Sequence, residues 1–110
     1  MNVAIASILL IHWFADFVLQ KREWAENKSK SIVALSKHCA IYSICFMVFG
    51  FVFGFSYWLI NSVSHFVIDF ITSKCTSKLY KKGDYHNFFV VIGFDQFLHL
   101  LILLYPFILI

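Results

Sequence analysis

The stretch Asn61-Ser-Val-Ser-His-Phe-Val-Ile-Asp-Phe-Ile-Thr-Ser73 lies inside an apolar segment and decides how this chain folds. It carries Asn61, His65 and Asp69 at intervals of four residues. Because an α-helix turns once in about 3.6 residues, these three side chains share one helical face. A carboxylate and an imidazole on a lipid-embedded helix are costly and persist only with partners. The stretch therefore predicts an all-α membrane protein whose polar side chains meet in its interior.

The composition agrees with a membrane protein. Of the 110 residues, 61% are hydrophobic and 14% are charged, and fourteen are Phe. These values predict one integral membrane domain over residues 1–110 rather than a soluble core. The cysteines lie in or beside apolar segments, where we expect small buried side chains rather than a disulfide framework or a metal motif. They are Cys39, Cys45 and Cys75.

Apolar segments long enough to cross a bilayer lie at about residues 2–20, 31–54, 55–72 and 88–110. The first lacks a preceding basic region and a clear cleavage site, so we expect it to be retained. All nine Lys and Arg residues fall in or beside the first and third connections. The positive-inside rule makes those connections cytoplasmic and places both termini outside. The sequence thus predicts a four-helix transmembrane bundle, and its basic loops are typical of membrane flanks rather than of a nucleic-acid surface.

Three of these segments carry an Asp and a His four residues apart. The pairs are His12 and Asp16, His65 and Asp69, and Asp95 and His99. The last segment runs opposite to the first and third, and its order is reversed, so every pair places Asp nearer the cytoplasm and His one turn deeper. An isolated histidine, His38, lies at nearly the same depth in the second segment. We therefore expect all seven side chains to converge in one band.

Imidazole nitrogen and carboxylate oxygen are ligands for zinc, and also for manganese and iron. Seven such groups suffice for two metal ions, or for one ion with additional catalytic and orienting residues. Buried carboxylates would otherwise be forced to take up protons, and a divalent cation removes that conflict. We expect a divalent metal, with zinc the first choice. Asp16, Asp69 and Asp95 are expected to divide the roles of ligand and general base.

Simpler interpretations also fit these residues. A single intramembrane Asp–His pair is more often a packing hydrogen bond or a proton relay than a metal site. Gln20, Asn61 and Gln96 are expected to form hydrogen bonds between helices rather than to bind metal. His86 lies in a predicted loop, at 73–87, and is expected in solvent. The occurrence of three Asp–His pairs at one depth favours the metal.

The order of these motifs resembles a known family. It runs His-aromatic-x-x-Asp-Phe-x-x-Gln from residue 12, an isolated His, His-Phe-x-Ile-Asp-Phe from residue 65 and Asp-Gln-x-x-His from residue 95. This pattern looks like that of small bacterial and phage membrane proteins of unknown function, and it covers most of the chain. The resemblance implies a multi-pass protein of the bacterial inner membrane, encoded by a phage or prophage.

More distantly, the pattern is similar to the membrane-bound metal-dependent hydrolases associated with the SOS response. Those are in turn reminiscent of zinc-dependent phospholipase C, an α-helical enzyme with His and Asp ligands. The distant link implies phosphoester hydrolysis. The chain lacks the length and the full ligand set of that larger enzyme, so the resemblance supports the site more than the reaction.

Several functions fit these residues. A metal-dependent hydrolase would act on a lipid or lipid-linked phosphoester at the cytoplasmic face, where the basic loops attract an anionic headgroup. A small carrier or channel for a divalent metal or for protons needs the same side chains, but the outer halves of the segments are almost wholly apolar. A phage-type factor that binds a host protein is a third alternative. A di-iron or haem site is disfavoured, because Glu-x-x-His is absent and haem would not explain three Asp. The sequence leaves a homo-oligomer open.

Overall fold

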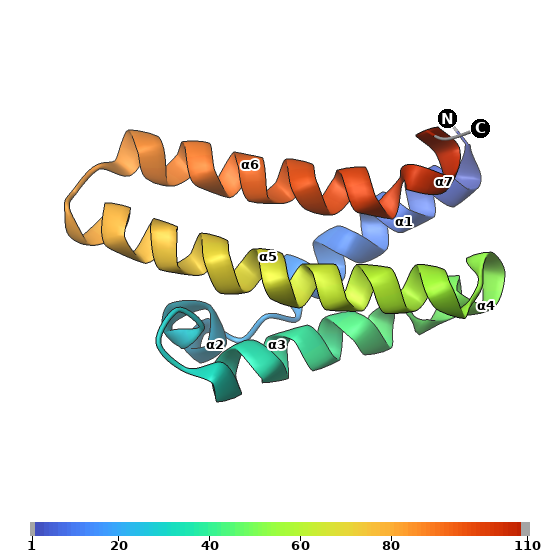
Figure 1. Cartoon of the computed structure of the whole chain (residues 1–110), viewed down its shortest axis with the longest axis horizontal. Helices are drawn as coiled ribbons and strands as arrows, with labels where there is room; N and C mark the ends of the chain where they lie inside the picture. The colour runs from blue at the N-terminus through green and yellow to red at the C-terminus, as the bar shows by residue number, and fades with distance from the viewer. Residues whose placement is uncertain (1, 109–110) are drawn as a thin grey trace.

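The computed structural model describes residues 2–108, which are helical with no strand among them. The antiparallel helices α5 and α6 run the length of the molecule, and α3 packs against α5 (Figure 1). Residues 1, 109 and 110 lie outside the described part. They include the first residue of the predicted domain and the last two residues of the predicted span 88–110. The elements are α1 (Val3–Trp13), the π-helical turn η1 (Phe14–Val18), α2 (Arg22–Asn27), α3 (Ile32–Cys45), α4 (Met47–Phe53), α5 (Phe55–Lys81), α6 (Tyr85–Leu103) and α7 (Tyr105–Ile108).

Short polar side chains and one glycine set the helix ends. Asn2 and Ser31 cap α1 and α3 by accepting hydrogen bonds from the backbone amides two and three residues ahead. Asp84 caps α6, and its hydrogen bonds from the side chain and backbone of Asn87 lower the pKa of its carboxyl. Gly54, where the second predicted span ends, separates α4 from α5 at φ 105°, a conformation that favours glycine.

Several helix ends differ from the sequence prediction. The loop predicted at 73–87 is much shorter, because α5 continues to Lys81 and α6 begins at Tyr85. The first connection contains the short helix α2, and the second predicted span is bent by 46° between α3 and α4. Hydrophobicity measures the length of an apolar run, whereas a helix can continue into water on its backbone hydrogen bonds. Cys75 lies on this extension and is exposed, so the prediction of a buried side chain is wrong for it.

Only part of the four-span prediction is met by length and composition. Among the described residues, α6 is long and apolar enough to cross a membrane, and α3 with α4 adds a second span if the bent pair is one. The helical run from Val3 to Val18 is shorter than this test requires. The polar face of α5, with Asn61, His65 and Asp69, lowers the mean hydropathy of an otherwise long helix.

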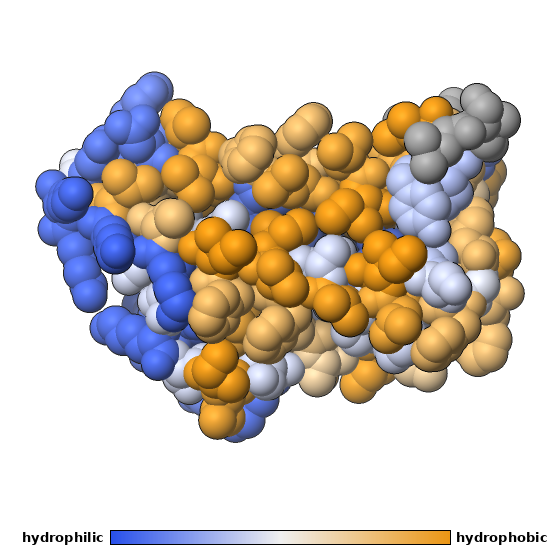
Figure 2. Space-filling model, viewed as in Figure 1, coloured by the Kyte–Doolittle hydropathy of each residue, from blue (hydrophilic) through white to orange (hydrophobic). Residues whose placement is uncertain are grey.

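Apolar side chains cover much of the outside of the molecule. Figure 2 shows them over most of one face, with hydrophilic residues gathered at the end where α5 joins α6. Phe51 is 87% exposed and Phe89 is 67% exposed, whereas His38 and Asp69 are 0% and 1% exposed. Proteins that fold in water show the opposite distribution, and large exposed apolar patches mark contact with a partner or a membrane.

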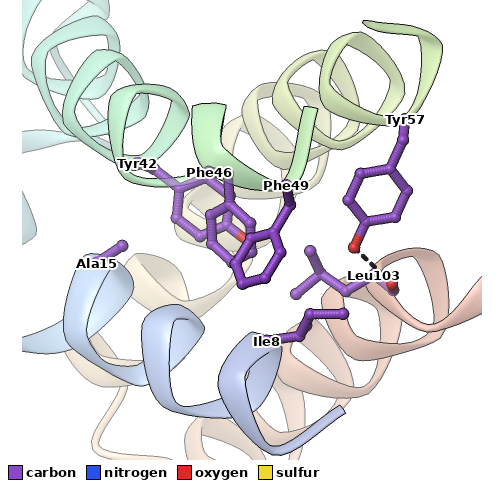
Figure 3. Packing of buried hydrophobic residues seen from close by; sticks show 7 residues of the cluster. All are labelled: Ile8, Ala15, Tyr42, Phe46, Phe49, Tyr57 and Leu103. Atoms are coloured by element: carbon purple, nitrogen blue, oxygen red, sulfur yellow. Dashed lines mark hydrogen bonds between the residues drawn. The ribbon is translucent and has the colours of Figure 1, made fainter. Parts of the chain in front are cut away.

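A small aromatic and aliphatic core closes the end of the bundle opposite the basic loops. Ile8 of α1, Phe46 after α3 and Leu103 of α6 pack together there (Figure 3). The hydroxyl of Tyr57 donates to the carbonyl oxygen of Leu103 at 2.7 Å. Tyr42 joins this core to the polar interior, since its ring packs on Phe46 on the apolar side and stacks on a histidine of α5. The core therefore holds the main helices in place beside the polar side chains.

Candidate metal centre

Four ligand atoms from three helical elements meet in the interior. They are Oδ1 of Asp16 in η1, Nε2 of His38 in α3, and Nε2 of His65 and Oδ2 of Asp69 in α5. All four residues are buried, and one ligand atom from each lies within 4.8 Å of the others. The five distances that involve a histidine nitrogen lie between 2.9 and 3.6 Å. We call these residues the group of four.

The spacing fits one tetrahedral ion. Zinc binds imidazole nitrogen and carboxylate oxygen at about 2.0–2.1 Å, so neighbouring tetrahedral ligands are about 3.3–3.4 Å apart. The two Nε2 atoms face each other at 3.1 Å, and both also face carboxylate oxygens, which only accept hydrogen bonds. A cation at the centre satisfies all four lone pairs at once. The residues present therefore fit a divalent metal.

The histidine rings of this group are positioned mainly by packing. The ring of His65 stacks on Tyr42, with 3.7 Å between centroids and 4° between planes. Nδ1 of His38 and Nδ1 of His65 have no hydrogen-bond partner within the described residues. Metal-binding histidines usually donate their second ring nitrogen to a carboxylate or carbonyl, and for His65 the stacking contact with Tyr42 is found in place of that hydrogen bond.

A second group consists of Asp16, Asp95 and His99, all buried, with one ligand atom from each within 4.8 Å of the others. We call it the group of three. Nδ1 of His99 lies 2.8 Å from the carbonyl oxygen of Asp95. Since a carbonyl only accepts, Nδ1 carries a proton, and in the neutral ring Nε2 then carries a lone pair. That Nε2 has no partner in the described part of the chain and lies 3.6 Å from Oδ1 of Asp69.

Gln96 and His12 support the carboxylates through a chain of hydrogen bonds. The hydroxyl of Tyr42 donates to Nδ1 of His12 at 3.1 Å, and Nε2 of His12 donates to Oε1 of Gln96 at 2.7 Å. The amide of Gln96 then donates to Oδ2 of Asp16 at 3.1 Å and to Oδ2 of Asp95 at 2.9 Å. One arrangement of protons satisfies every member of this chain. Both ring nitrogens of His12 are engaged in it.

The structure brings most of the expected side chains together but leaves His12 outside both groups. Its Nε2 is 3.8 Å from Oδ2 of Asp16, behind Gln96 rather than among the ligand atoms. The His65 and Asp69 pair lies on a regular α-helix, and both residues join the group of four. The His12 and Asp16 pair crosses from α1 into the wider turn of η1, so equal spacing does not give the same direction.

The polar residues for which simpler roles were expected have mixed outcomes. Gln96 bonds between helices as predicted. Asn61 instead donates to the carbonyl oxygen of Tyr57 in its own helix. Oε1 of Gln20 has no partner among the described residues. His86 is exposed, as predicted, but it lies in the first turn of α6 and not in a loop.

Lys28 is a candidate that sequence reasoning missed. Its Nζ donates to Oδ2 of Asp69 at 3.3 Å, and its side chain is 20% exposed. Lys28 directly follows the short helix α2, and the connection there folds back so that Lys28 reaches Asp69 of the group of four. No periodicity in the sequence signals this contact, because it depends on how a loop folds and not on a helical face.

A pocket of about 250 Å³ lies beside the carboxylates, and Lys28 and Thr76, near the basic loops, contribute to its lining. Asp16 and Asp95 line it, as does Lys28, whereas His38 and His65 do not. Three hydroxyl side chains of α5 complete its polar wall, and the hydroxyl of one of them, Ser73, is buried without a partner among the described residues. The pocket therefore combines a cation, hydroxyl groups and carboxylates.

A protein-family model described as "Protein of unknown function (DUF3307)" matches residues 4–109 of the chain. The matched range includes both metal-ligand groups and the pocket. No curated protein and no solved structure matches the chain.

Proposed function

Since the chain belongs to this family of unknown function (DUF3307), membership brings no activity with it, and we propose a function from the site. The protein is a membrane-embedded, metal-dependent hydrolase that cleaves a lipid or lipid-linked phosphoester at the cytoplasmic face. The observation that carries the proposal is the group of four, whose ligand atoms have the spacing of a tetrahedral ion.

Charge supports a bound cation. Asp16, Asp69 and Asp95 are buried together, and the ammonium group of Lys28 contacts Asp69. Two unit charges 4 Å apart interact by about 4 kcal/mol at an effective dielectric constant of 20. Three carboxylates with one ammonium group thus repel one another strongly, whereas one divalent ion makes the set neutral.

The pocket supports hydrolysis. A bound zinc ion supplies a Lewis acid and lowers the pKa of a coordinated water molecule to about 7. Lys28 is placed to bind the phosphate oxygens, and Asp95 presents a carboxylate that can accept a proton from the attacking water. The water oxygen bonds to phosphorus, the phosphorus–oxygen bond to the alcohol breaks, and the leaving oxygen takes up a proton.

The surface supports placement in a membrane, and the basic loops support its orientation. We expect a four-span bundle with both termini outside the cytoplasm, as the distribution of Lys and Arg predicts. A cytoplasmic reporter fused after residue 110 should be inactive, and the same reporter inserted at Gly83 should be active. Activity of the C-terminal fusion in the cytoplasm would contradict this topology.

A carrier or channel for metal or protons is the main alternative. It requires a polar path that continues past the site toward the other face of the membrane. The aromatic and aliphatic core, including Phe46, Tyr57 and Leu103, lies in that direction. This arrangement favours an enzyme open to one side.

The function can be tested with purified protein and lipid vesicles. We expect bound zinc or manganese, and release of phosphate or a phosphorylated headgroup from vesicles of phosphatidylcholine with phosphatidylglycerol, phosphatidic acid or a polyprenyl phosphate. A chelator should stop the reaction and zinc should restore it. Lys28→Gln should keep its metal and lose about 10–100-fold in kcat/KM, the cost of one hydrogen bond to a charged group. Lys37→Gln, on the same basic side of the bundle, is the control.

Two outcomes would contradict the function. A well-folded protein that binds no divalent metal would exclude the metal site. Metal binding without cleavage, together with metal flux into liposomes, would assign the protein to the transporters.

A further inference from the structure

We propose that the site holds two metal ions and that the second ion, bound by the group of three, is the one that meets the substrate. The inference rests on the proposed function and assigns separate tasks to the two groups. It also defines the substrate class, a lipid phosphomonoester.

Ligand number separates the two groups. The group of four offers four protein ligands, which is the closed arrangement of a structural zinc site. The group of three offers Asp16, Asp95 and His99. Three protein ligands with one open position is the arrangement of catalytic zinc sites. The second group is therefore the one with room for water and substrate.

Two carboxylates each face both groups. Oδ1 of Asp16 lies 2.9 Å from Nε2 of His38, and its Oδ2 lies on the side of Gln96 and Asp95. Oδ2 of Asp69 lies 3.2 Å from Nε2 of His38, and its Oδ1 lies 3.6 Å from Nε2 of His99. Carboxylates that divide their oxygens in this way can link two ions about 3.5–4 Å apart, the separation in two-metal hydrolases.

His99 supplies an independent sign of a missing cation. The residue is 3% exposed, and its Nδ1 is committed to the carbonyl oxygen of Asp95. In the neutral ring its Nε2 lone pair faces Oδ1 of Asp69, which is also an acceptor, and finds no donor among the described residues. Two buried acceptors that face each other are costly unless a positive charge lies near both.

The pocket lies against the group of three. Asp16 and Asp95 line its wall, whereas the other three residues of the group of four, His38, His65 and Asp69, do not. Its volume of about 250 Å³ suits a headgroup more than an acyl chain, and the buried hydroxyl of Ser73 has no partner in the described part. A phosphate group here would meet Lys28 and that hydroxyl together.

Charge then selects the substrate. Three carboxylates and Lys28 leave two negative charges, and two divalent ions change this to two positive charges. A phosphomonoester carries nearly two negative charges at pH 7, because its second pKa is about 6. It restores neutrality, whereas a phosphodiester with one charge does not. We therefore expect phosphatidic acid to be cleaved faster than phosphatidylglycerol.

The experiment compares metal content and spectroscopy with activity. Wild-type protein should bind two equivalents of manganese and show the electron paramagnetic resonance spectrum of an exchange-coupled pair. His99→Ala should bind one equivalent, show an isolated-ion spectrum and lose at least 100-fold in hydrolysis. Asp95→Asn, which keeps the side-chain shape, should do the same, and His86→Ala should behave like wild type because His86 is exposed in the first turn of α6, away from both groups.

The outcomes separate the two proposals. Hydrolytically active wild type that saturates at one equivalent, or a folded His99→Ala protein that still holds two, would overturn the second site and leave the proposed function standing. Wild type that binds no metal would overturn both. Preference for phosphatidylglycerol over phosphatidic acid would overturn the substrate class.

Discussion

Replacing Asp16 with asparagine is expected to remove both metal ions and to lower hydrolysis at least about 10³-fold, the upper range for loss of one electrostatic group. Asp16 is the only residue shared by the group of four and the group of three among the described residues. Its Oδ1 lies next to Nε2 of His38, and its Oδ2 accepts a hydrogen bond from the side-chain amide of Gln96. An amide has one acceptor oxygen, so its NH₂ group would occupy the place of one carboxylate oxygen and could not bind an ion there.

The measurement is metal content and vesicle hydrolysis of Asp16→Asn beside Asp84→Asn. Asp84 caps α6 by accepting from the backbone of Asn87, and asparagine serves as a helix cap equally well. The control should therefore keep both metal and activity. A folded Asp16→Asn protein with its full metal content would show that this carboxylate is not a ligand.

Replacing Asp69 with asparagine is the second large effect that we expect. The change removes the negative charge that faces His38, His65 and Lys28 at 3.2–3.5 Å. Metal should be lost from the group of four, and hydrolysis should fall about 10²–10³-fold, because the remaining ion loses its bridging carboxylate. The bundle should still assemble, since Asp69 is isosteric with asparagine and the apolar core lies elsewhere.

Thermal unfolding in detergent gives the clearest readout for this variant. Ligand at 100 times its dissociation constant stabilises a folded protein by about 2.7 kcal/mol, so zinc should raise the melting temperature of the wild type. Asp69→Asn should show a much smaller rise. An equal rise in both proteins would mean that zinc binds without Asp69 and that the group of four is not the first site.

The clustering of these side chains was largely predictable because it follows helix geometry. His65 with Asp69 and Asp95 with His99 lie one turn apart on regular helices, so their spacing gives their shared direction. The reversed order in α6 brings the two pairs together across antiparallel helices. His38 could be added because it is the only histidine of its segment and lies at nearly the depth of the Asp–His pairs.

The remaining features depend on tertiary structure that spacing does not encode. Lys28 reaches Asp69 because a loop folds over the bundle. Tyr42 orients His12 and His65, although its position in an apolar segment predicts only a buried core residue. The extension of α5 to Lys81 lies outside any apolar run, so hydropathy ended the span early. Backbone hydrogen bonding decides such boundaries, and residue type constrains it weakly.

The π-helical turn of η1 has a consequence for how relatives of this chain are aligned. A turn closed by i to i+5 hydrogen bonds, such as that from Leu19 to Phe14, takes one residue more than an α-helical turn. A relative with one residue fewer between His12 and Gln20 would form an ordinary α-helical turn there. Its aspartate would then stand one position away from Asp16 in an alignment without gaps. Gap-free matching would then score the aspartate as lost, and a single gap within residues 14–18 restores the correspondence.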